Sequence, residues 1–164
     1  MGRLWCIFLL FLLAGCDSGE PGKLSTGEFE GDEGEAVARY IIAHVPELDP
    51  KVPKIYCVVK GPRLISTKMD FTRRMNDLKL KFVSGEVLTV QEPNKSIVDP
   101  ATGVSPITIQ LLEMKRTGAT TTEVVAGWAY KKTWERHRYK VTTSPERKVE
   151  DLGRIEGNYE KPVQ

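Results

Sequence analysis

The sequence predicts an α+β fold, in which an N-terminal amphipathic helix packs on a curved antiparallel sheet of four to five strands, with a short second helix. Three observations support this prediction. Apolar residues recur at helical spacing in residues 32–45, a run of β-forming residues occupies 55–59, and alternating apolar and polar residues recur from residue 107 onward. Because the strands follow the helices and do not alternate with them, α+β is favoured over α/β.

The first sixteen residues carry the features of an export signal. Arg3 supplies a positive charge, and residues 4–13 are all apolar. Such a run is too short to span a bilayer as a helix, which takes about 20 residues, but it has the length of a signal-peptide core. Residues 13–16 read Leu-Ala-Gly-Cys, and this motif resembles the signal of bacterial lipoproteins. The alternatives are an ordinary cleaved signal and an uncleaved anchor.

The lipoprotein resemblance implies that residues 1–15 are removed and that Cys16 becomes the lipid-bearing first residue. The lipid on Cys16 would attach the protein to the cell membrane, facing the periplasm or the exterior, and two or more acyl chains give stable anchoring. Asp17 directly after the cysteine resembles the signal for retention at the inner membrane, which slightly favours that membrane.

The remaining chain has the length of one domain. Removing residues 1–15 from 164 leaves 149 residues, which fits a single domain and a tether better than two domains. Residues 16–31 are polar and rich in glycine, so we assign them to a lipidated flexible tether. We assign residues 32–158 to a single α+β domain and residues 159–164 to a C-terminal tail.

The first helix is expected to begin at Asp32, which serves as N-cap with Glu35 three residues later. Its apolar face has the spacing i, i+3, i+4, i+7, i+8 and comprises Val37, Tyr40, Ile41, His44 and Val45. Prolines at positions 46, 50 and 53 end the helix and lead to a buried strand at residues 55–59.

A second helix is expected after Thr67, where Phe71, Met75 and Leu78 share one face. The rest is predicted to be β-structure with one loop at residues 93–104. The expected strands cover residues 80–90, 107–114, 121–130, 137–143 and 148–155. In residues 137–143 the alternation places Tyr139 and Val141 inward and Arg138 and Lys140 outward.

Four short motifs stand out in the domain, namely Glu35-Ala36-Val37, residues 55–59, Gly127-Trp128-Ala129-Tyr130 and Tyr139-Lys140-Val141. In these motifs the domain resembles small bacterial domains of the NTF2-like and cystatin-like α+β type. The resemblance implies a curved sheet over the helix, with room for a pocket in its concave face, and it implies no particular reaction.

The inventory of reactive residues gives no catalytic residue, metal site or cofactor motif. Cys57 is the only cysteine after position 16, and an apolar strand raises the pKa of a thiol, so pairing it with His44 gives a poor nucleophile. Acids at positions 28, 30 and 32 alternate as in a calcium loop, but Glu33 and Arg39 stand where that loop needs glycine and glutamate.

One segment is both basic and aromatic. We interpret it as a membrane or polyanion contact made by Lys131, Lys132, Trp134, Arg136, Arg138 and Lys140. The alternative is a hairpin whose charged face is simply solvated. Because the chain carries an export signal, nucleic acid is not an expected partner of this segment.

The expected function is therefore that of a membrane-anchored lipoprotein of the bacterial cell envelope with a non-catalytic binding or interaction domain. Its partner is expected to be an envelope protein or a small ligand held by the concave face of the sheet. If side chains fill that face, only protein contact remains. The alternative is a small NTF2-like enzyme, a hydrolase or isomerase, with its pocket in the same face.

Overall fold

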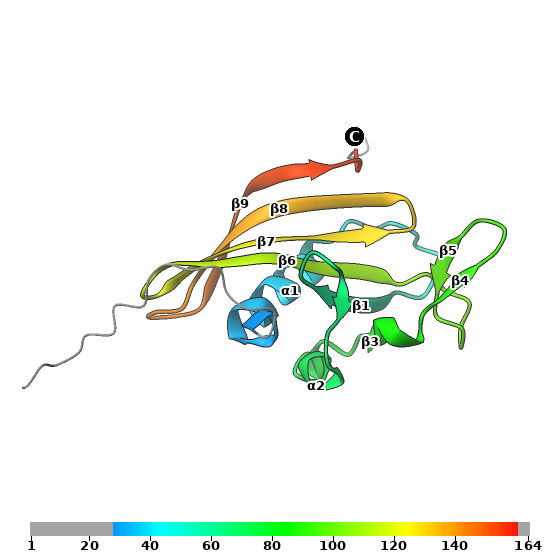
Figure 1. Cartoon of the computed structure of the whole chain (residues 1–164), viewed down its shortest axis with the longest axis horizontal. Helices are drawn as coiled ribbons and strands as arrows, with labels where there is room; N and C mark the ends of the chain where they lie inside the picture. Colours follow the sequence, from blue (N-terminus) through cyan, green and yellow to red (C-terminus); the bar gives the residue numbers. More distant parts are fainter. Residues whose placement is uncertain (1–27, 161–164) are drawn as a thin grey trace, which may run out of the picture.

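The computed structural model describes residues 28–160, which form a single large sheet, a separate two-stranded hairpin and short helices (Figure 1). The helices are η1 Glu28–Glu30, α1 Asp32–His44, α2 Met69–Arg73, η2 Asn76–Leu78 and η3 Gly85–Val87. The strands are β1 Ile55–Lys60, β2 Ile65–Ser66, β3 Lys81–Phe82, β4 Thr89–Gln91, β5 Ser96–Val98, β6 Ile107–Gly118, β7 Thr121–Tyr130, β8 Thr133–Thr142 and β9 Lys148–Gly157.

The large sheet has seven strands and is mixed. Its main order is β2-β1-β6-β7-β8-β9, and β3 also pairs with β1. Strands β6 to β9 follow one another as antiparallel neighbours, whereas β1 runs parallel to both β6 and β3. Strands β4 and β5 form the separate hairpin, which projects from one end of the sheet (Figure 1).

The predicted fold class is wrong. Strands account for 45% of the structure and helices for 20%, and the sheet is mixed and has seven strands in place of four or five antiparallel ones. The difference comes from β1, which joins β6 in parallel although 46 residues separate the two strands. Strands β2 and β3 have two residues each, so they are too short to produce a period in the sequence.

Most of the longer elements were predicted close to their observed positions. The helix α1, the strands β1 and β7 and the short α2 are confirmed, but the N-cap of α1 is Gly31, and Asp32 lies in its first turn. The predicted strand at residues 80–90 is wrong, because β3, η3 and the start of β4 occupy it. The predicted loop at residues 93–104 contains β5.

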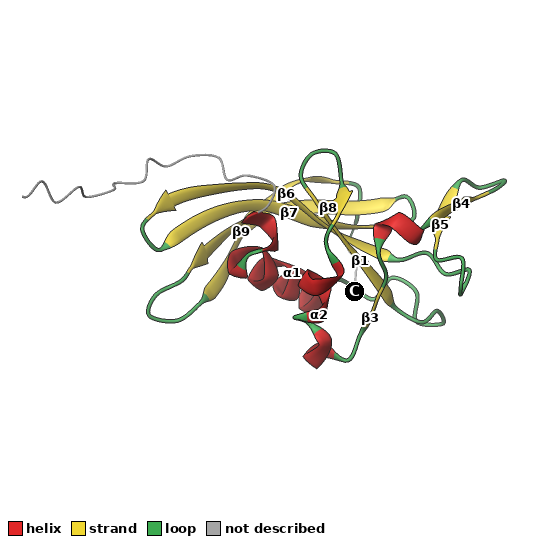
Figure 2. Cartoon of the chain, turned by 60° about the horizontal axis from the view of Figure 1, so that its bottom comes forward, coloured by secondary structure: helices red, strands yellow, loops and turns green. Residues whose placement is uncertain are grey.

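The helix α1 packs along one face of strands β6 to β9, here called the inner face (Figure 2). Side chains from alternate positions of these strands bury themselves against the helix; they include Ile109, Leu111, Val124, Ala126, Tyr139 and Val141. The helix contributes Val37, Ala38 and Ile41 to the same core. The opposite face of the four strands is called the outer face.

The chain joins the core before α1 begins. Phe29, which our sequence analysis places in the tether, is buried in the core, with 3% of its surface exposed. Its neighbour Glu30 forms an ion pair with Lys60 of β1, with 2.8 Å between Oε1 and Nζ. The fold therefore includes residues 28–31.

Ion pairs fix the N-terminal end of α1 to three other segments. Arg74, just after α2, contacts the carboxylates of Asp32 and Glu35. Arg39 bridges Glu35 and Asp77, both at 2.8 Å, and so connects the helix to η2. Arg147, in the turn before β9, binds the other oxygen of Asp32 at 2.6 Å.

Replacing Gly34 with alanine tests the packing of residues 28–31 against α1. Helix propensity alone predicts that alanine stabilises the helix by about 1 kcal/mol. A Cβ at this position would lie 1.9 Å from the carbonyl oxygen of Phe29. We therefore expect Gly34→Ala to lower the free energy of unfolding by about 2 kcal/mol or more, measured by urea denaturation. The control Ala36→Gly should cost only about 1 kcal/mol, and a stabilised Gly34→Ala would contradict this packing.

The pH dependence of stability tests the Glu30 ion pair. Burial raises the pKa of Glu30, but hydrogen bonds from Lys60 and from the backbone N–H of Lys68, with the charges of both lysines, outweigh burial and hold this pKa below its ordinary value. A carboxyl whose pKa is lowered in the folded state adds stability above its unfolded pKa and loses it as the pH falls.

The variant Glu30→Gln should therefore be less stable than the original chain at pH 7, by about 1–3 kcal/mol. The difference should shrink as the pH falls from 5 to 3, because the original carboxyl then becomes protonated. Urea denaturation at several pH values measures this, with Glu86→Gln, an exposed position, as the control. A difference that stays constant with pH would show that the charge of Glu30 does not stabilise the fold.

Candidate functional site

The helix α1 is too short to cover the whole inner face. Its 13 residues span about 20 Å at 1.5 Å per residue, whereas the ten residues of β8 span about 34 Å. The helix ends at His44, and Pro46 turns the chain away from it. The inner face is therefore filled by side chains along most of its length but is open beyond the C-terminal end of α1.

A pocket of about 240 Å³ lies at this open end. We call it the aromatic–acidic pocket. Its lining comes from the end of α1, from β7, β8 and β9, and from the segment after β9; it comprises Tyr40, Ile41, His44, Pro46, Trp128, Glu135, His137, Tyr139, Asp151 and Tyr159. The volume is below the roughly 300–1,000 Å³ of pockets for drug-sized ligands, so it suits a smaller molecule.

Two carboxylates flank one imidazole in this pocket. Glu135 and His137 point to the same side of β8 because they are two residues apart, and Asp151 approaches from β9. Nδ1 of His137 lies 2.8 Å from Oδ2 of Asp151, and Nε2 lies 3.3 Å from Oε1 of Glu135. Each ring nitrogen therefore faces a carboxylate oxygen of the protein.

The cation Arg154 lies at the rim of the pocket, next to Glu135. Nε of Arg154 lies 3.6 Å from the same Glu135 oxygen, and its guanidinium also donates to the backbone oxygens of Gly157 and Tyr159. The charged and titratable groups gathered here are thus the carboxylates of Glu135 and Asp151, the imidazole of His137 and the guanidinium of Arg154.

Aromatic rings form the remaining walls. Tyr40 and His44 stack with 4.1 Å between ring centroids, and Tyr40 meets Tyr139 edge-on at 5.6 Å. On the other side, Trp128 and Tyr159 meet edge-on at 5.3 Å. These pairs hold the rings in place around the carboxylates, because edge-on and stacked pairs are the favoured arrangements of aromatic side chains.

Tyr139 reports the electrostatic character of the pocket. Burial, and to a smaller extent the neighbouring acidic groups of Asp151, Tyr40 and Glu135, raises the pKa of Tyr139 well above its ordinary value. The side chain therefore stays a neutral phenol at physiological pH. Burial, the larger cause, disfavours any charge, whereas the carboxylates of Asp151 and Glu135 both oppose a phenolate and attract a positively charged ligand.

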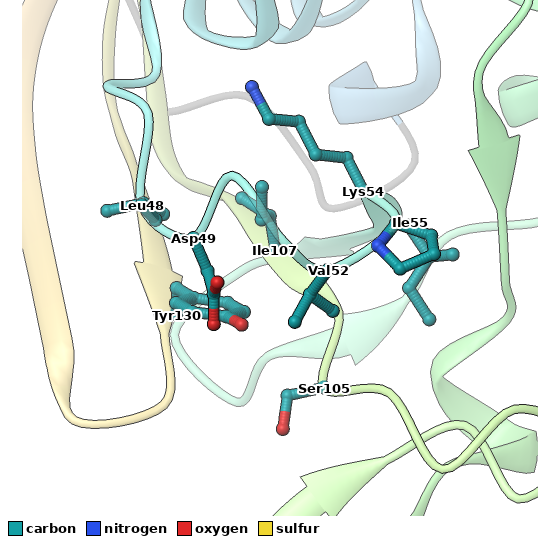
Figure 3. Close-up of a pocket in the computed structure, with 9 residues that line it drawn as sticks. Leu48, Asp49, Val52, Lys54, Ile55, Ser105, Ile107 and Tyr130 are labelled. Atoms are coloured by element: carbon teal, nitrogen blue, oxygen red, sulfur yellow. The ribbon is translucent and has the colours of Figure 1, made fainter.

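The basic residues expected to form one contact are split into two groups. Lys131 and Lys132 make up the turn between β7 and β8. The ammonium of Lys131 lies 3.8 Å from Asp49 and 4.9 Å from the ring centroid of Tyr130. Figure 3 shows Asp49 and Tyr130 beside a small cavity of about 10 Å³, which has room for about one water molecule and for no larger ligand.

The second group lies on the outer face of β8 and comprises Trp134, Arg136, Arg138 and Lys140. Arg136 is held by Glu156, with 2.5 Å between Nη1 and Oε1, and its guanidinium lies over the ring of Trp134. Lys140 stands in register between Glu123 and Glu150. Of the three cations in this group, Arg136 alone forms an ion pair within residues 28–160, and Arg138 stands in register with Val125 and Gly153.

The cysteine–histidine pair does not form a site. Cys57 is buried with 1% of its surface exposed, and burial raises the pKa of its thiol to about 11. His44 instead stacks on Tyr40 at the rim of the aromatic–acidic pocket. Cys16, the expected lipidation site, lies outside the described residues.

Residues 28–160 show neither a metal-binding cluster nor a membrane-spanning helix. No three His, Cys, Asp or Glu side chains of this range are grouped so that they would hold a metal ion. No helix in the same range has both the length and the apolar character needed to cross a membrane.

The aromatic–acidic pocket was not predicted from the sequence, although one signal for it was present. The alternation that correctly places Tyr139 and Val141 inward extends backward to His137 and Glu135. Two ionisable residues at inward positions of a strand indicate a site and not a core. Asp151 and Tyr159 gave no local signal, because they reach the pocket only through the pairing of β9 with β8.

Comparison of the chain with protein-family models, with curated proteins and with solved structures gives no match.

Proposed function

We propose that the chain is a lipid-anchored protein of the bacterial cell envelope whose folded domain binds a small amine-bearing ligand in the aromatic–acidic pocket. The lipid anchor is supported by the sequence at residues 13–16. The ligand class is supported by the pocket itself, and the observation that carries it is the placement of two carboxylates among aromatic rings.

The chemistry of the pocket matches an organic cation. Glu135 and Asp151 offer carboxylate oxygens whose negative charge attracts an ammonium group, including a quaternary ammonium that has no N–H to donate. Tyr40, Trp128 and Tyr159 provide aromatic rings, which attract cations placed over their faces. The same two carboxylates contribute, after burial, to the raised pKa of Tyr139.

A hydrolase or isomerase is the second candidate, and the contact between His137 and Asp151 favours it. A carboxylate that orients an imidazole is a common arrangement for a general base. The base must then present its other nitrogen to the substrate. Here Glu135 lies 3.3 Å from that nitrogen, so an incoming substrate would have to displace it. We therefore favour binding over catalysis.

Titration with choline, measured by isothermal calorimetry, tests the ligand class. We expect choline to bind, and 3,3-dimethyl-1-butanol, its uncharged carbon analogue, to bind at least tenfold more weakly, because only the cation gains from the rings and carboxylates. The variant Asp151→Asn should weaken choline binding by about tenfold.

The matched control is Glu123→Gln, which removes one negative charge from the outer face of β7. This variant should bind choline as the original chain does. Equal binding of choline and its neutral analogue would contradict the amine-binding proposal, and so would an equal loss in both variants.

The anchor is tested by replacing Cys16 with alanine in the full chain. We expect this variant to lose incorporation of radiolabelled palmitate and retention in the membrane fraction, because the lipid attaches through the Cys16 sulfur and the new N-terminus. A Cys57→Ala variant is the control and should keep both. Palmitate labelling that persists in Cys16→Ala would show that the lipoprotein interpretation is wrong.

A further inference from the structure

A second and larger depression lies on the outer side of the sheet, at the end where β7 turns into β8. Its volume is about 800 Å³, and it lies between the β4–β5 hairpin and the turn at Lys131 and Lys132. We call it the basic groove. Thr108, Gln110 and Ala129 of β6 and β7 form its floor. It is separate from the aromatic–acidic pocket, which lies on the inner face.

The charge of the basic groove is entirely positive. Lys95, Lys131 and Lys132 line it, and its lining contains no Asp or Glu. Lys131 has the distant partner Asp49 at 3.8 Å. Within residues 28–160, Lys95 and Lys132 have no carboxylate within 4.0 Å. Two ammonium groups on opposite walls are therefore open to an anionic ligand.

Polar groups on the lining add hydrogen-bond donors between the lysines. The amide oxygen of Gln110 accepts a weak hydrogen bond of 3.5 Å from Arg136. The amide nitrogen of Gln110 is then the atom left to donate into the groove. The hydroxyl groups of Ser105, Thr108 and Thr133 also line the groove. Ammonium, amide and hydroxyl donors together suit the oxygens of a phosphate.

Part of the groove lining is also apolar, on the β4–β5 hairpin and on the turn between β1 and β2. Ile97 is 54% exposed and Leu64 is 41% exposed, and both line the groove. In the β4–β5 hairpin, Ile97 pairs with Val90, which is 62% exposed. An apolar surface beside unpaired lysines matches a ligand that joins an anionic group to a hydrocarbon chain.

We propose that the basic groove binds the head group of an anionic phospholipid, with the first part of the acyl chain against Leu64 and Ile97. Basic pockets that hold anionic head groups are a known mode of lipid recognition. The proposal goes beyond ligand binding in the aromatic–acidic pocket and rests on the proposed anchor only for the nearness of a membrane. It assigns the lipid contact to Lys95 and Lys132 and not to Arg138 and Lys140.

Photo-cross-linking of the full chain in vesicles tests this assignment. The photoreactive substitution Asn94→p-benzoylphenylalanine lies in the groove lining, and Ala119→p-benzoylphenylalanine, in the distant β6–β7 turn, is the background control. The vesicles contain equal amounts of phosphatidylglycerol and phosphatidylcholine. We expect position 94 to yield at least five times more phosphatidylglycerol adduct than phosphatidylcholine adduct, since one lysine contributes about fivefold near an anionic surface.

Two double variants, which remove the same charge, then compare the contribution of the groove lysines with that of the cations on β8. Lys95→Gln with Lys132→Gln should reduce the phosphatidylglycerol adduct to the phosphatidylcholine level. Arg138→Gln with Lys140→Gln removes the same charge from the outer face of β8 and should leave the adduct unchanged. Equal labelling of both lipids, no adduct above the position 119 background, or a loss caused by the β8 pair alone would overturn the proposal.

Flotation of the same vesicles tests the lipid anchor independently of the basic groove. A chain that does not float contradicts the lipid anchor, and the groove is then tested with dihexanoylphosphatidylglycerol below its micelle concentration. Adducts at position 94 that depend on Lys95 and Lys132 would support the groove without the anchor. Complete competition by millimolar sodium phosphate would instead show a site for free phosphate and overturn the lipid assignment.

Discussion

The ion pairs at the N-terminal end of α1 determine where the fold remains open. Arg74, Arg39 and Arg147 fix the first two turns of the helix to α2, η2 and the turn before β9. Because that end is fixed and the helix is shorter than the strands, the uncovered part of the inner face falls beyond His44. The aromatic–acidic pocket occupies this part, and Tyr159 closes its far side. The position of the candidate site thus follows from the ion pairs that fix the N-terminal end of α1 and from the shorter length of α1 compared with the strands.

Both candidate sites lie at the same end of the sheet, on its two opposite faces. Neighbouring residues of β7 belong to different sites, since Trp128 lines the aromatic–acidic pocket and Ala129 lines the basic groove. The alternation of a strand is what separates them, because successive side chains point to opposite faces. A single layer of backbone therefore divides an aromatic pocket that contains two carboxylates from a groove that is lined by three lysines.

Local patterns predicted the elements of this fold better than their assembly. The helical spacing of Val37 and Ile41 and the alternation of Tyr139 and Val141 gave α1 and β8, because both patterns reflect burial on one side. The parallel pairing of Tyr56 with Ile107 is set by contacts far apart in the chain, and no local pattern encodes it. The aromatic–acidic pocket also depends on contacts between residues that are far apart in the chain. Its β8 residues were visible as inward polar positions, whereas Asp151 arrives only through strand pairing.

The basic segment shows why charge in a strand cannot be interpreted from the strand alone. In sequence, Arg136, Arg138 and Lys140 form one positive stretch. In the sheet, Lys115, Glu123, Lys140 and Glu150 stand in one row across four strands, so the charges alternate from strand to strand. Opposite charges in register stabilise each other modestly and leave little net field. The basic groove differs from this row because Lys95, Lys131 and Lys132 line it together with no Asp or Glu, and for this reason we assign an anionic partner to Lys95 and Lys132.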